Sequence, residues 1–273
     1  MEAAVASDWT GRAGTDLAHP ARRYDYWLGG KDNYAADRES GDAIAAAFPA
    51  IRTAVVENRA FLRRVVRTLA AQYGIRQFLD IGTGIPTSPN VHEVAQEVAP
   101  AARVVYVDND PIVLAHARAL LTGAPEGATA YVDADLRDPH RIVADKALKA
   151  TLDLTRPVAL MLVAVVHFLP DDDKPHELVA DLLAELAPGS FLVMSHATTE
   201  GLDPELAAQI QEGRHGPGRL RDRDEFARFM TGLDLLDPGI VSVAEWRAQD
   251  EPRPRPAFEE VAVWGAVGRK AAG

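Results

Sequence analysis

From about residue 77 onward, short apolar runs alternate with longer segments in which apolar residues recur every three or four positions. Short apolar runs predict buried strands, and the longer spacing predicts amphipathic helices. We predict strands at 77–81, 103–108, 129–133, 158–165, 191–195, 240–243 and 261–267. Helices are predicted between them near 89–98, 111–121, 139–150 and 173–187. Strands and helices in alternation are typical of an α/β fold, in which helices wind over both faces of a parallel sheet.

The region before the first strand has a different pattern. Residues 1–20 are small and polar without periodicity, and we interpret them as a loose tail or a lid that becomes ordered with ligand. Two helices are predicted at 34–48 and 51–73, and Gly74 ends the second. Its apolar residues recur at helical spacing, and its arginines, on the opposite side, are interpreted as a solvated face.

The length and composition of the chain are consistent with one compact unit. The chain has 273 residues, of which 47% are hydrophobic, and this is enough for a large core. We expect residues 1–75 to form a tail and helical cap, and residues 76–273 to form the Rossmann-like core. The proline-rich stretch 251–256 is interpreted as a rigid surface linker into the last strand.

Composition also excludes several classes of protein. The chain has no cysteine, so disulfides, thiolate nucleophiles and cysteine-ligated zinc are excluded. The longest apolar run, 158–166, is too short to span a membrane, and the first residues do not have the pattern of a secretory leader, so we expect a cytoplasmic protein without a membrane partner. The net charge of −11 disfavours nucleic acid as a partner. The sequence leaves open whether the chain forms a homo-oligomer.

The loop after the first predicted strand is the first candidate site. The sequence FLDIGTG places Asp80 in the strand and Gly82, Thr83 and Gly84 in the turn that follows. Two glycines at this spacing let the backbone turn sharply and let a ligand approach the main chain closely. A tight turn without any ligand would have the same two glycines, so the loop alone does not decide the function.

The next two strands also end in acidic residues. The second ends at Asp108, followed by Asn109, and a carboxylate there can accept hydrogen bonds from both hydroxyls of an adenosine ribose. The third leads to Asp135 and Leu136, from which a side chain can reach an adenine amino group. Because ligands of open parallel sheets bind at the carboxyl ends of the strands, these three strand ends predict a nucleoside site.

The same loop favours S-adenosylmethionine over NAD as the nucleoside ligand. A dinucleotide fingerprint has a third glycine where this sequence has Thr87. The acidic Asp80 would repel a pyrophosphate, but it suits a ligand that carries an ammonium and a sulfonium. S-adenosylmethionine has both groups, and NAD has neither.

Several motifs together resemble those of class I S-adenosylmethionine-dependent methyltransferases: FLDIGTG, VVYVDNDPIVLAHARALL, DADLRDP and VALMLVAVVHFLPD. The sequence is still more similar to an actinobacterial methyltransferase family first catalogued as a domain of unknown function. That resemblance runs from about residue 21 to 270 and includes PARRYDYWLGGKDNYAADR and VAVWGAVGRK. It implies a seven-stranded sheet with an antiparallel last strand. It also implies cofactor contacts at Asp80, Gly82, Gly84, Asp108, Asn109, Asp135 and the stretch 164–167, which includes Ala164, Val165 and His167.

The string PARRYDYWLGGKDNY is dense in aromatic residues, glycines and charge. One interpretation is a turn whose aromatic side chains pack on the core. The other is a cap over the cofactor, in which Tyr24 or a neighbouring aromatic holds the sulfonium by cation–π attraction. In that case Lys31 or Arg23 would meet the methionine carboxylate, and Gly29-Gly30 would be the hinge.

Two histidines are candidates for a general base. Methyl transfer needs a base only if the acceptor must lose a proton. His167 lies just past the fourth strand and His196 just after the fifth, although each could instead be a hydrogen-bonded core residue. No set of His, Asp and Glu residues has metal-ligand spacing, and the acidic run 171–173 is interpreted as a helix-start cap.

We therefore expect S-adenosylmethionine-dependent methyl transfer to an oxygen or nitrogen of an unidentified small molecule. Two other functions stay open at this point. One is a non-catalytic S-adenosylmethionine sensor or binding subunit on the same fold. The other is an NAD-dependent oxidoreductase, which Thr87 and Asp80 disfavour.

Overall fold

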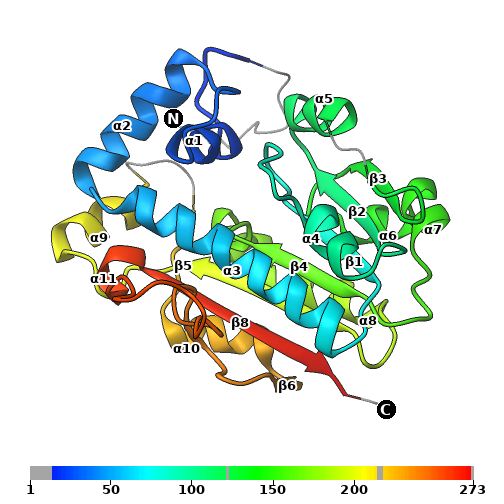
Figure 1. Cartoon of the computed structure of the whole chain (residues 1–273). Coiled ribbons are helices and arrows are strands. Elements are labelled where there is room, and N and C mark those ends of the chain that lie inside the picture. Colours follow the sequence, from blue (N-terminus) through cyan, green and yellow to red (C-terminus); the bar gives the residue numbers. More distant parts are fainter. Residues whose placement is uncertain (1–13, 121–122, 214–217, 272–273) are drawn as a thin grey trace.

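An eight-stranded mixed sheet forms the centre of the molecule (Figure 1). The structure is a computed structural model that describes residues 14–120, 123–213 and 218–271, so most of the predicted tail, residues 1–13, lies outside the described residues. The strands lie in the order β3 (Ala128–Asp133), β2 (Arg103–Asp108), β1 (Gln77–Ile81), β4 (Ala159–Val163), β5 (Phe191–Ala197), β8 (Val263–Lys270) and β6 (Leu233–Leu235). The two-residue strand β7 (Val241–Ser242) also pairs with β8.

The directions of the strands confirm the Rossmann-like sheet. Strands β3, β2, β1, β4 and β5 pair in parallel, and β8 runs antiparallel to β5. The segment after residue 232 pairs with the outer edge of β8 twice: β7 lies within the predicted strand 240–243, and β6 is the additional, eighth strand. Strand β6 has only three residues, too few to show a periodicity in the sequence.

Most strand bounds lie close to the predicted ones. Strands β1 and β2 have the predicted bounds, β3 begins one residue earlier, β5 runs two residues further, and β4 is shorter at both ends. The last strand is displaced toward the C-terminus, because Val261 belongs to the short helix α11 (Phe258–Val261). Ala262 follows this helix in the left-handed region, with a φ of 46°, and the chain then enters β8.

Helices precede the sheet and connect its strands. The N-terminal part forms three, of which the last two match the predicted helices, while α1 is not predicted. Helices α9, α10 and α11, near the C-terminal strands, are also not predicted. The α-helices before α11 are α1 (Pro20–Trp27), α2 (Ala35–Ala47), α3 (Ile51–Gln72), α4 (Val91–Val98), α5 (Pro111–Leu120), α6 (Pro139–Ala144), α7 (Lys146–Thr151), α8 (Pro175–Ala184), α9 (Pro204–Gln211) and α10 (Arg223–Ala227). Short 3₁₀ turns form η1 (Val166–Phe168), η2 (Asp171–Asp173) and η3 (Arg228–Met230).

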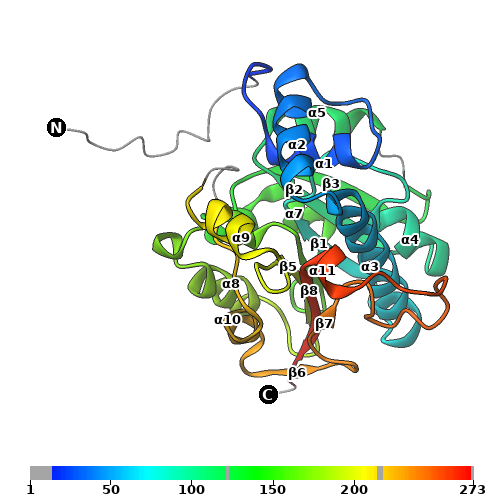
Figure 2. The same ribbon diagram turned by 90° about the vertical axis from the view of Figure 1, so that its left-hand side faces the viewer.

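The helices cover both faces of the sheet. Figures 1 and 2 show α3 and α4 on one face and α8 and α10 on the other. Side chains that alternate along a strand divide between the two cores: Phe78 and Met161 pack on the α3 side, whereas Leu79 and Leu160 pack on the α8 side. Because β4 is buried on both faces, its sequence ALMLV is an apolar run without alternation.

Three predictions about helix ends are wrong. The helix predicted at 139–150 is split at Asp145, whose side chain caps α7. Helix α4 begins after Asn90 and not at Pro89, because Asn90 belongs to a capping box. The acidic run Asp171–Asp173 does not cap α8, since it forms the separate turn η2, and the residue before α8 has no side-chain cap.

The sequence suggested that the arginines of α3 form a solvated face, and this holds for only part of them. Arg52 and Arg67 are exposed, but Arg64 is bonded within the protein. Arg64 donates to the carbonyl oxygens of Trp246 (2.9 Å) and Val243 (2.6 Å), and it pairs with Glu251. Arg255, in the expected proline-rich linker, pairs with Glu57 of the same helix. Helix α3 therefore holds the segment before β8 in place, and that segment is more than a surface linker.

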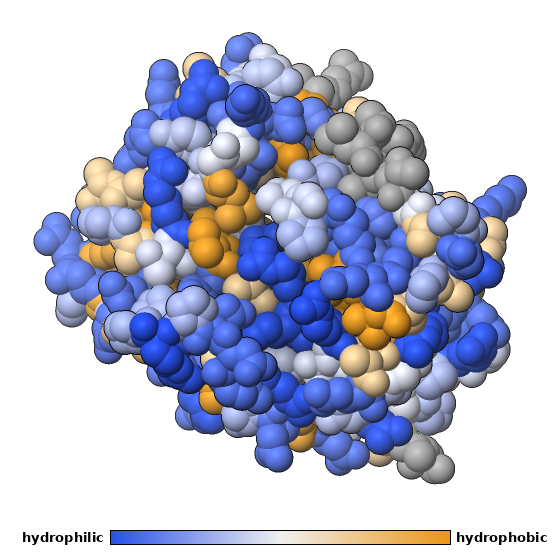
Figure 3. Space-filling view, viewed as in Figure 1, coloured by the Kyte–Doolittle hydropathy of each residue, from blue (hydrophilic) through white to orange (hydrophobic). Residues whose placement is uncertain are grey.

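Two properties of the molecule bear on contact with a membrane or a partner. No helix within the described ranges is long and apolar enough to cross a membrane. Figure 3 shows that hydrophilic side chains cover most of the face seen in Figure 1, and apolar residues are visible there only in small, separate places. That face therefore shows no broad apolar patch.

Candidate active site

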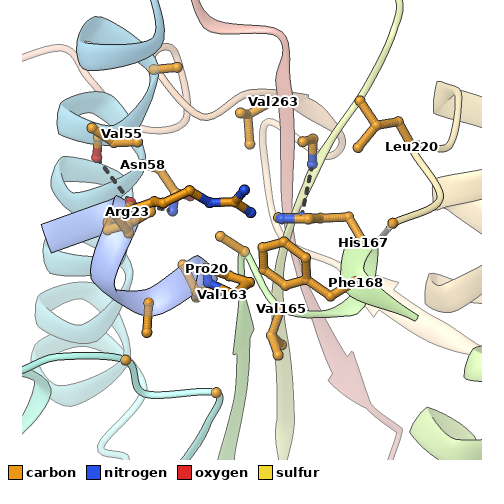
Figure 4. Close-up of a pocket in the computed structure, with 18 of the residues that line it drawn as sticks. Pro20, Arg23, Val55, Asn58, Val163, Val165, His167, Phe168, Leu220 and Val263 are labelled. Carbon is orange, nitrogen blue, oxygen red and sulfur yellow. Dashed lines mark hydrogen bonds between the residues drawn. The ribbon is translucent and has the colours of Figure 1, made fainter. Parts of the chain in front are cut away.

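A cavity of about 570 Å³ opens at the carboxyl ends of the parallel strands. Helix α1 contributes to its wall, and Figure 4 shows part of its lining. Most of the residues predicted to bind the cofactor line this one cavity. They are Tyr24, Asp80, Gly82, Thr83, Gly84, Asp108, Asn109, Asp135, Leu136, Ala164, Val165 and His167.

The glycine loop depends on its two glycines for conformation and for space. Gly82 and Gly84 have φ values of 73° and 66°, in the left-handed region that side chains disfavour. A Cβ atom on Gly82 would lie only 2.4 Å from a methyl carbon of Val165, so this position has no room for a side chain. The loop thus brings its backbone against the turn that follows β4.

Asp108 holds this loop as well as lining the cavity. One carboxylate oxygen accepts the backbone N–H of Gly84 at 2.9 Å, and the other accepts that of Asp110 at 3.0 Å. Burial raises the pKa of Asp108 to about 6, although these backbone hydrogen bonds oppose the rise. The carboxylate therefore lies where a ribose was predicted, and it fixes the glycine loop at the same time.

Asp135 sits in a network of polar side chains at the rim. Asn109 donates to one of its oxygens at 2.7 Å, and the backbone N–H of Arg137 donates to the other at 2.8 Å. The Arg137 guanidinium links Asp135 to Asp173 of η2. Both oxygens of Asp135 thus have partners within the protein, and Leu136 supplies a buried apolar side chain beside them.

Asp80 and Arg59 place opposite charges in the wall of the cavity. Burial raises the pKa of Asp80 to about 7, the charge of Arg59 lowers it, and the nearby Asp108 raises it further. Arg59 also donates to the carbonyl oxygen of Pro89 at 3.0 Å, which holds it beside the loop. This pair could receive the ammonium and the carboxylate of an amino acid. No sequence pattern pointed to Arg59, because its helical position looked solvated.

Helix α1 is anchored to the core through a chain of buried hydrogen bonds. The Tyr24 hydroxyl donates to the carbonyl oxygen of Val55 (3.1 Å) and accepts from the Asn58 amide (3.0 Å). The Asn58 amide oxygen accepts from the Ser195 hydroxyl (2.7 Å), which in turn accepts the N–H of Ala164 (3.0 Å). The N-terminal string is therefore a docked helix that forms a wall of the cavity, and not a simple turn.

Two details of the predicted cap differ in the structure. Arg23 lies in α1 and lines the cavity, whereas Lys31 lies beyond the end of this helix, is exposed and does not line the cavity. Gly30 is not a loose hinge: its N–H donates to the carbonyl oxygen of Asp25 at 2.9 Å, and a Cβ atom would collide with the Asp25 carboxylate. Gly29, with a φ of 80°, has open space around it.

The two candidate bases occupy different places. His167 lines the cavity, and burial lowers its pKa to about 4, helped by the charges of Arg221 and Arg23. His196 lies behind it and does not line the cavity. Its Nδ1 lies 2.7 Å from the carbonyl oxygen of Ala197 and its Nε2 3.3 Å from Arg221, so both ring nitrogens have partners. His196 is therefore a buried structural histidine, and its prediction as a base is wrong.

The cavity continues into an apolar part that the sequence did not reveal. Strands β1, β2 and β3 supply its polar end, while α2, α3, α9 and β8 line the rest. We call this second part the apolar chamber. Its wall includes Ile44, Phe48, Val55, Leu206, Leu220 and Val263.

Comparison with known proteins identifies the family. A model of the S-adenosyl methyltransferase family matches residues 8–271. The chain belongs to this family. It is an S-adenosylmethionine-dependent methyltransferase, and its family favours this activity over an NAD-dependent oxidation and over a non-catalytic sensor. Among curated proteins, none matches this S-adenosyl methyltransferase.

Two solved structures resemble this methyltransferase over nearly its whole length. A DUF574 family protein from Streptomyces avermitilis is 49% identical with a TM-score of 0.88, covering 94% of this chain and 98% of that one. A protein from Thermobifida fusca, provisionally named a methyltransferase, is 41% identical with a TM-score of 0.86, covering 94% and 96%. An O-methyltransferase family protein from Burkholderia thailandensis shares the fold at 16% identity and a TM-score of 0.52, covering 82% and 61%.

The residues of the cavity fit the cofactor of the family. Asp80 and Arg59 could hold the two charged groups of its methionine portion, and the glycine loop lines the cavity beside them. Asp108 lies where a ribose could reach it. The cofactor supplies an activated methyl group on a sulfonium. No group of three or more His, Asp or Glu residues in the described part of the chain is arranged to hold a metal ion.

Proposed function

We propose that this methyltransferase transfers the methyl group to an oxygen or nitrogen atom of a small molecule that binds in the apolar chamber. The observation that supports the proposal most directly is the continuity of the cavity. The polar end, with Asp80 and Asp108, matches the cofactor, and the apolar chamber extends beyond it toward α9 and β8. A binding protein for the cofactor alone would not need this second space.

The protein's part in such a reaction is mainly to position the reactants. A sulfonium is already a good leaving group, so rate comes from holding the acceptor in line and keeping water out. The apolar chamber supplies walls that exclude water, and His167 and Phe168 lie where it meets the end of β4. The acceptor is therefore expected to be largely apolar.

A methyl-transfer screen tests the proposal. The protein would be incubated with S-adenosylmethionine labelled in its methyl group and with a library of metabolites, and label in a small-molecule product would be measured. Ile210→Trp, which fills the chamber from α9, should lower that transfer about tenfold or more while S-adenosylhomocysteine still binds. Ala208→Trp, on the exposed side of the same helix, is the matched control. Label that appears in no small molecule, or transfer that Ile210→Trp leaves unchanged, would contradict the proposal.

A further inference from the structure

Two polar side chains reach toward each other across the apolar chamber: Arg23 from α1 and His167 from η1 (Figure 4). Arg23 is only 7% exposed, and one of its guanidinium nitrogens donates to the Ser40 hydroxyl at 3.0 Å. Its charge acts on the His167 ring, which places the two groups close together. Burying a positive charge is unfavourable unless negative charge lies nearby, and here the charge of Asp37 in α2 acts on Arg23. Asp37 also pairs with Arg22, so the two arginines share one carboxylate. Arg23 thus gives one wall of the chamber a positive potential.

The hydrogen bond of His167 makes this ring a donor toward the chamber. Its Nδ1 accepts the backbone N–H of Ala197 over a long 3.5 Å hydrogen bond. Since the pKa of His167 is about 4, the ring is neutral near pH 7, and its one proton must then be on Nε2. A ring in this tautomer offers an N–H to a ligand and cannot take up a proton at that atom. The prediction of His167 as a general base is therefore not supported by the hydrogen bonding.

The acids of the cavity lie elsewhere. Among the described residues that line it, the carboxylates are those of Asp80, Asp108, Asp135 and Asp173. They belong to β1, β2, the turn after β3 and η2, on the side of the sheet away from β8. The chamber between α3, α9 and β8 therefore combines apolar walls with an arginine and an N–H donor. A ligand with an apolar body and an anionic oxygen would complement it.

We propose that the methyl acceptor is a small apolar carboxylic acid, whose carboxylate binds between Arg23 and His167. This inference rests on the proposed function and narrows it to transfer onto oxygen. A carboxylate oxygen supplies both electrons of the new oxygen–carbon bond, and the sulfur keeps the electron pair of the carbon–sulfur bond that breaks. The products are a methyl ester and S-adenosylhomocysteine. No proton is released, so the reaction requires no base, which agrees with a histidine that can only donate.

The test compares acids with their uncharged counterparts. Titration calorimetry would measure binding of octanoate, phenylbutyrate and naphthoate, and of the three matching amides, to the protein saturated with S-adenosylhomocysteine. At least one acid should bind about tenfold or more tightly than its amide, because a charge-assisted hydrogen bond is worth more than a neutral one. Arg23→Gln should abolish that preference, and Arg23→Lys should keep part of it. Arg52→Gln, which removes an exposed charge outside the cavity, should leave it unchanged.

Each outcome has a defined meaning. If no acid binds more tightly than its amide, or if Arg23→Gln keeps the preference, the inference is wrong. If Arg23→Gln instead weakens the binding of S-adenosylhomocysteine, Arg23 contributes to the cofactor site and the inference also fails. A wild-type protein that binds no S-adenosylhomocysteine would count against the proposed function itself, so the two failures are distinguishable. Binding of S-adenosylhomocysteine by Arg23→Gln also shows that the variant is folded.

Discussion

At Gly82 the glycine loop passes against Val165 without room for a side chain. We expect Gly82→Ala to lower stability by about 1–2 kcal/mol through its positive φ, and by about 1–3 kcal/mol more through the collision. Gly74 is a matched control, since its φ of 68° is similar but its surroundings are open. Gly74→Ala should therefore lose only the stability that the positive φ costs, as measured by denaturant unfolding. Adding Val165→Ala should restore part of the loss in Gly82→Ala, and equal losses for the two glycine variants would contradict this explanation.

The second residue with a measurable consequence is Asp80. Because burial raises its pKa from the usual 3.8 to about 7, the native protein holds this proton more tightly than the unfolded chain does. Its contribution to the free energy of unfolding is then fully present below about pH 4 and is lost as the pH rises to about 7. Asp108, with a pKa of about 6, acts in the same direction. Asp80→Asn should consequently gain stability relative to wild type as the pH rises from 5 to 8, measured by urea unfolding.

The same residue should make cofactor binding depend on pH. An ammonium group favours the ionised carboxylate, so affinity for S-adenosylhomocysteine should rise between about pH 6 and 8. Calorimetry of the wild type should also detect proton release near pH 7. The Asp80→Asn variant should bind S-adenosylhomocysteine more weakly, and its affinity should no longer depend on pH in this range. A pH dependence that survives in Asp80→Asn would assign it to another group.

At the scale of the element, α1 decides the shape of the cavity. Its Tyr24 hydroxyl joins Val55 and Asn58 in a buried network, whereas the Tyr26 hydroxyl bonds Asp42 in an exposed position. Tyr24→Phe should cost about 1–2 kcal/mol, because it leaves buried groups without a partner. Tyr26→Phe, the matched change on the same helix, should stay within about 0.5 kcal/mol. If thermal unfolding shows a similar loss of stability for the two variants, α1 is not anchored through Tyr24.

Whether α1 also closes over the cofactor remains a prediction. Pro20 and Ala21 line the cavity, and Ala21 lies beside Gly84, so this end of the helix is placed to cover a ligand on the glycine loop. Amide hydrogen exchange in residues 19–28 should then slow when S-adenosylhomocysteine binds. Exchange that is slow already and unchanged by the ligand would mean that α1 is a permanent wall.

At the scale of the whole molecule, ligand binding should raise the free energy of unfolding. S-adenosylhomocysteine at 100 times its dissociation constant should add about 2.7 kcal/mol, because it binds only the native state. NAD at the same concentration should leave the melting temperature unchanged. The comparison is sharp because both ligands carry adenosine, and only one carries the amino acid that Asp80 and Arg59 could hold. A shift with NAD and none with S-adenosylhomocysteine would contradict this account of the polar end.

The sequence by itself determined the parallel part of the sheet and the polar end of the cavity. Strand β1 leads directly into Gly82, and β2 ends at Asp108 after a short apolar run, so these strand ends and the residues there follow from local pattern. The rule that parallel strands bind ligands at their carboxyl ends then brought these residues together. The resemblance of the sequence to S-adenosylmethionine-dependent methyltransferases then identified the cofactor.

Only the tertiary structure decided the rest, because it depends on contacts between segments far apart in the chain. Arg59 lines the cavity and Arg64 meets the carbonyl of Val243, although both lie on the helix side whose pattern looked solvated. His167 lies in the turn after β4 and His196 near the end of the neighbouring strand β5, yet one faces the cavity and the other is held behind it. Periodicity reports which side of a helix is polar. It does not report whether water, a carbonyl oxygen or a ligand meets that side.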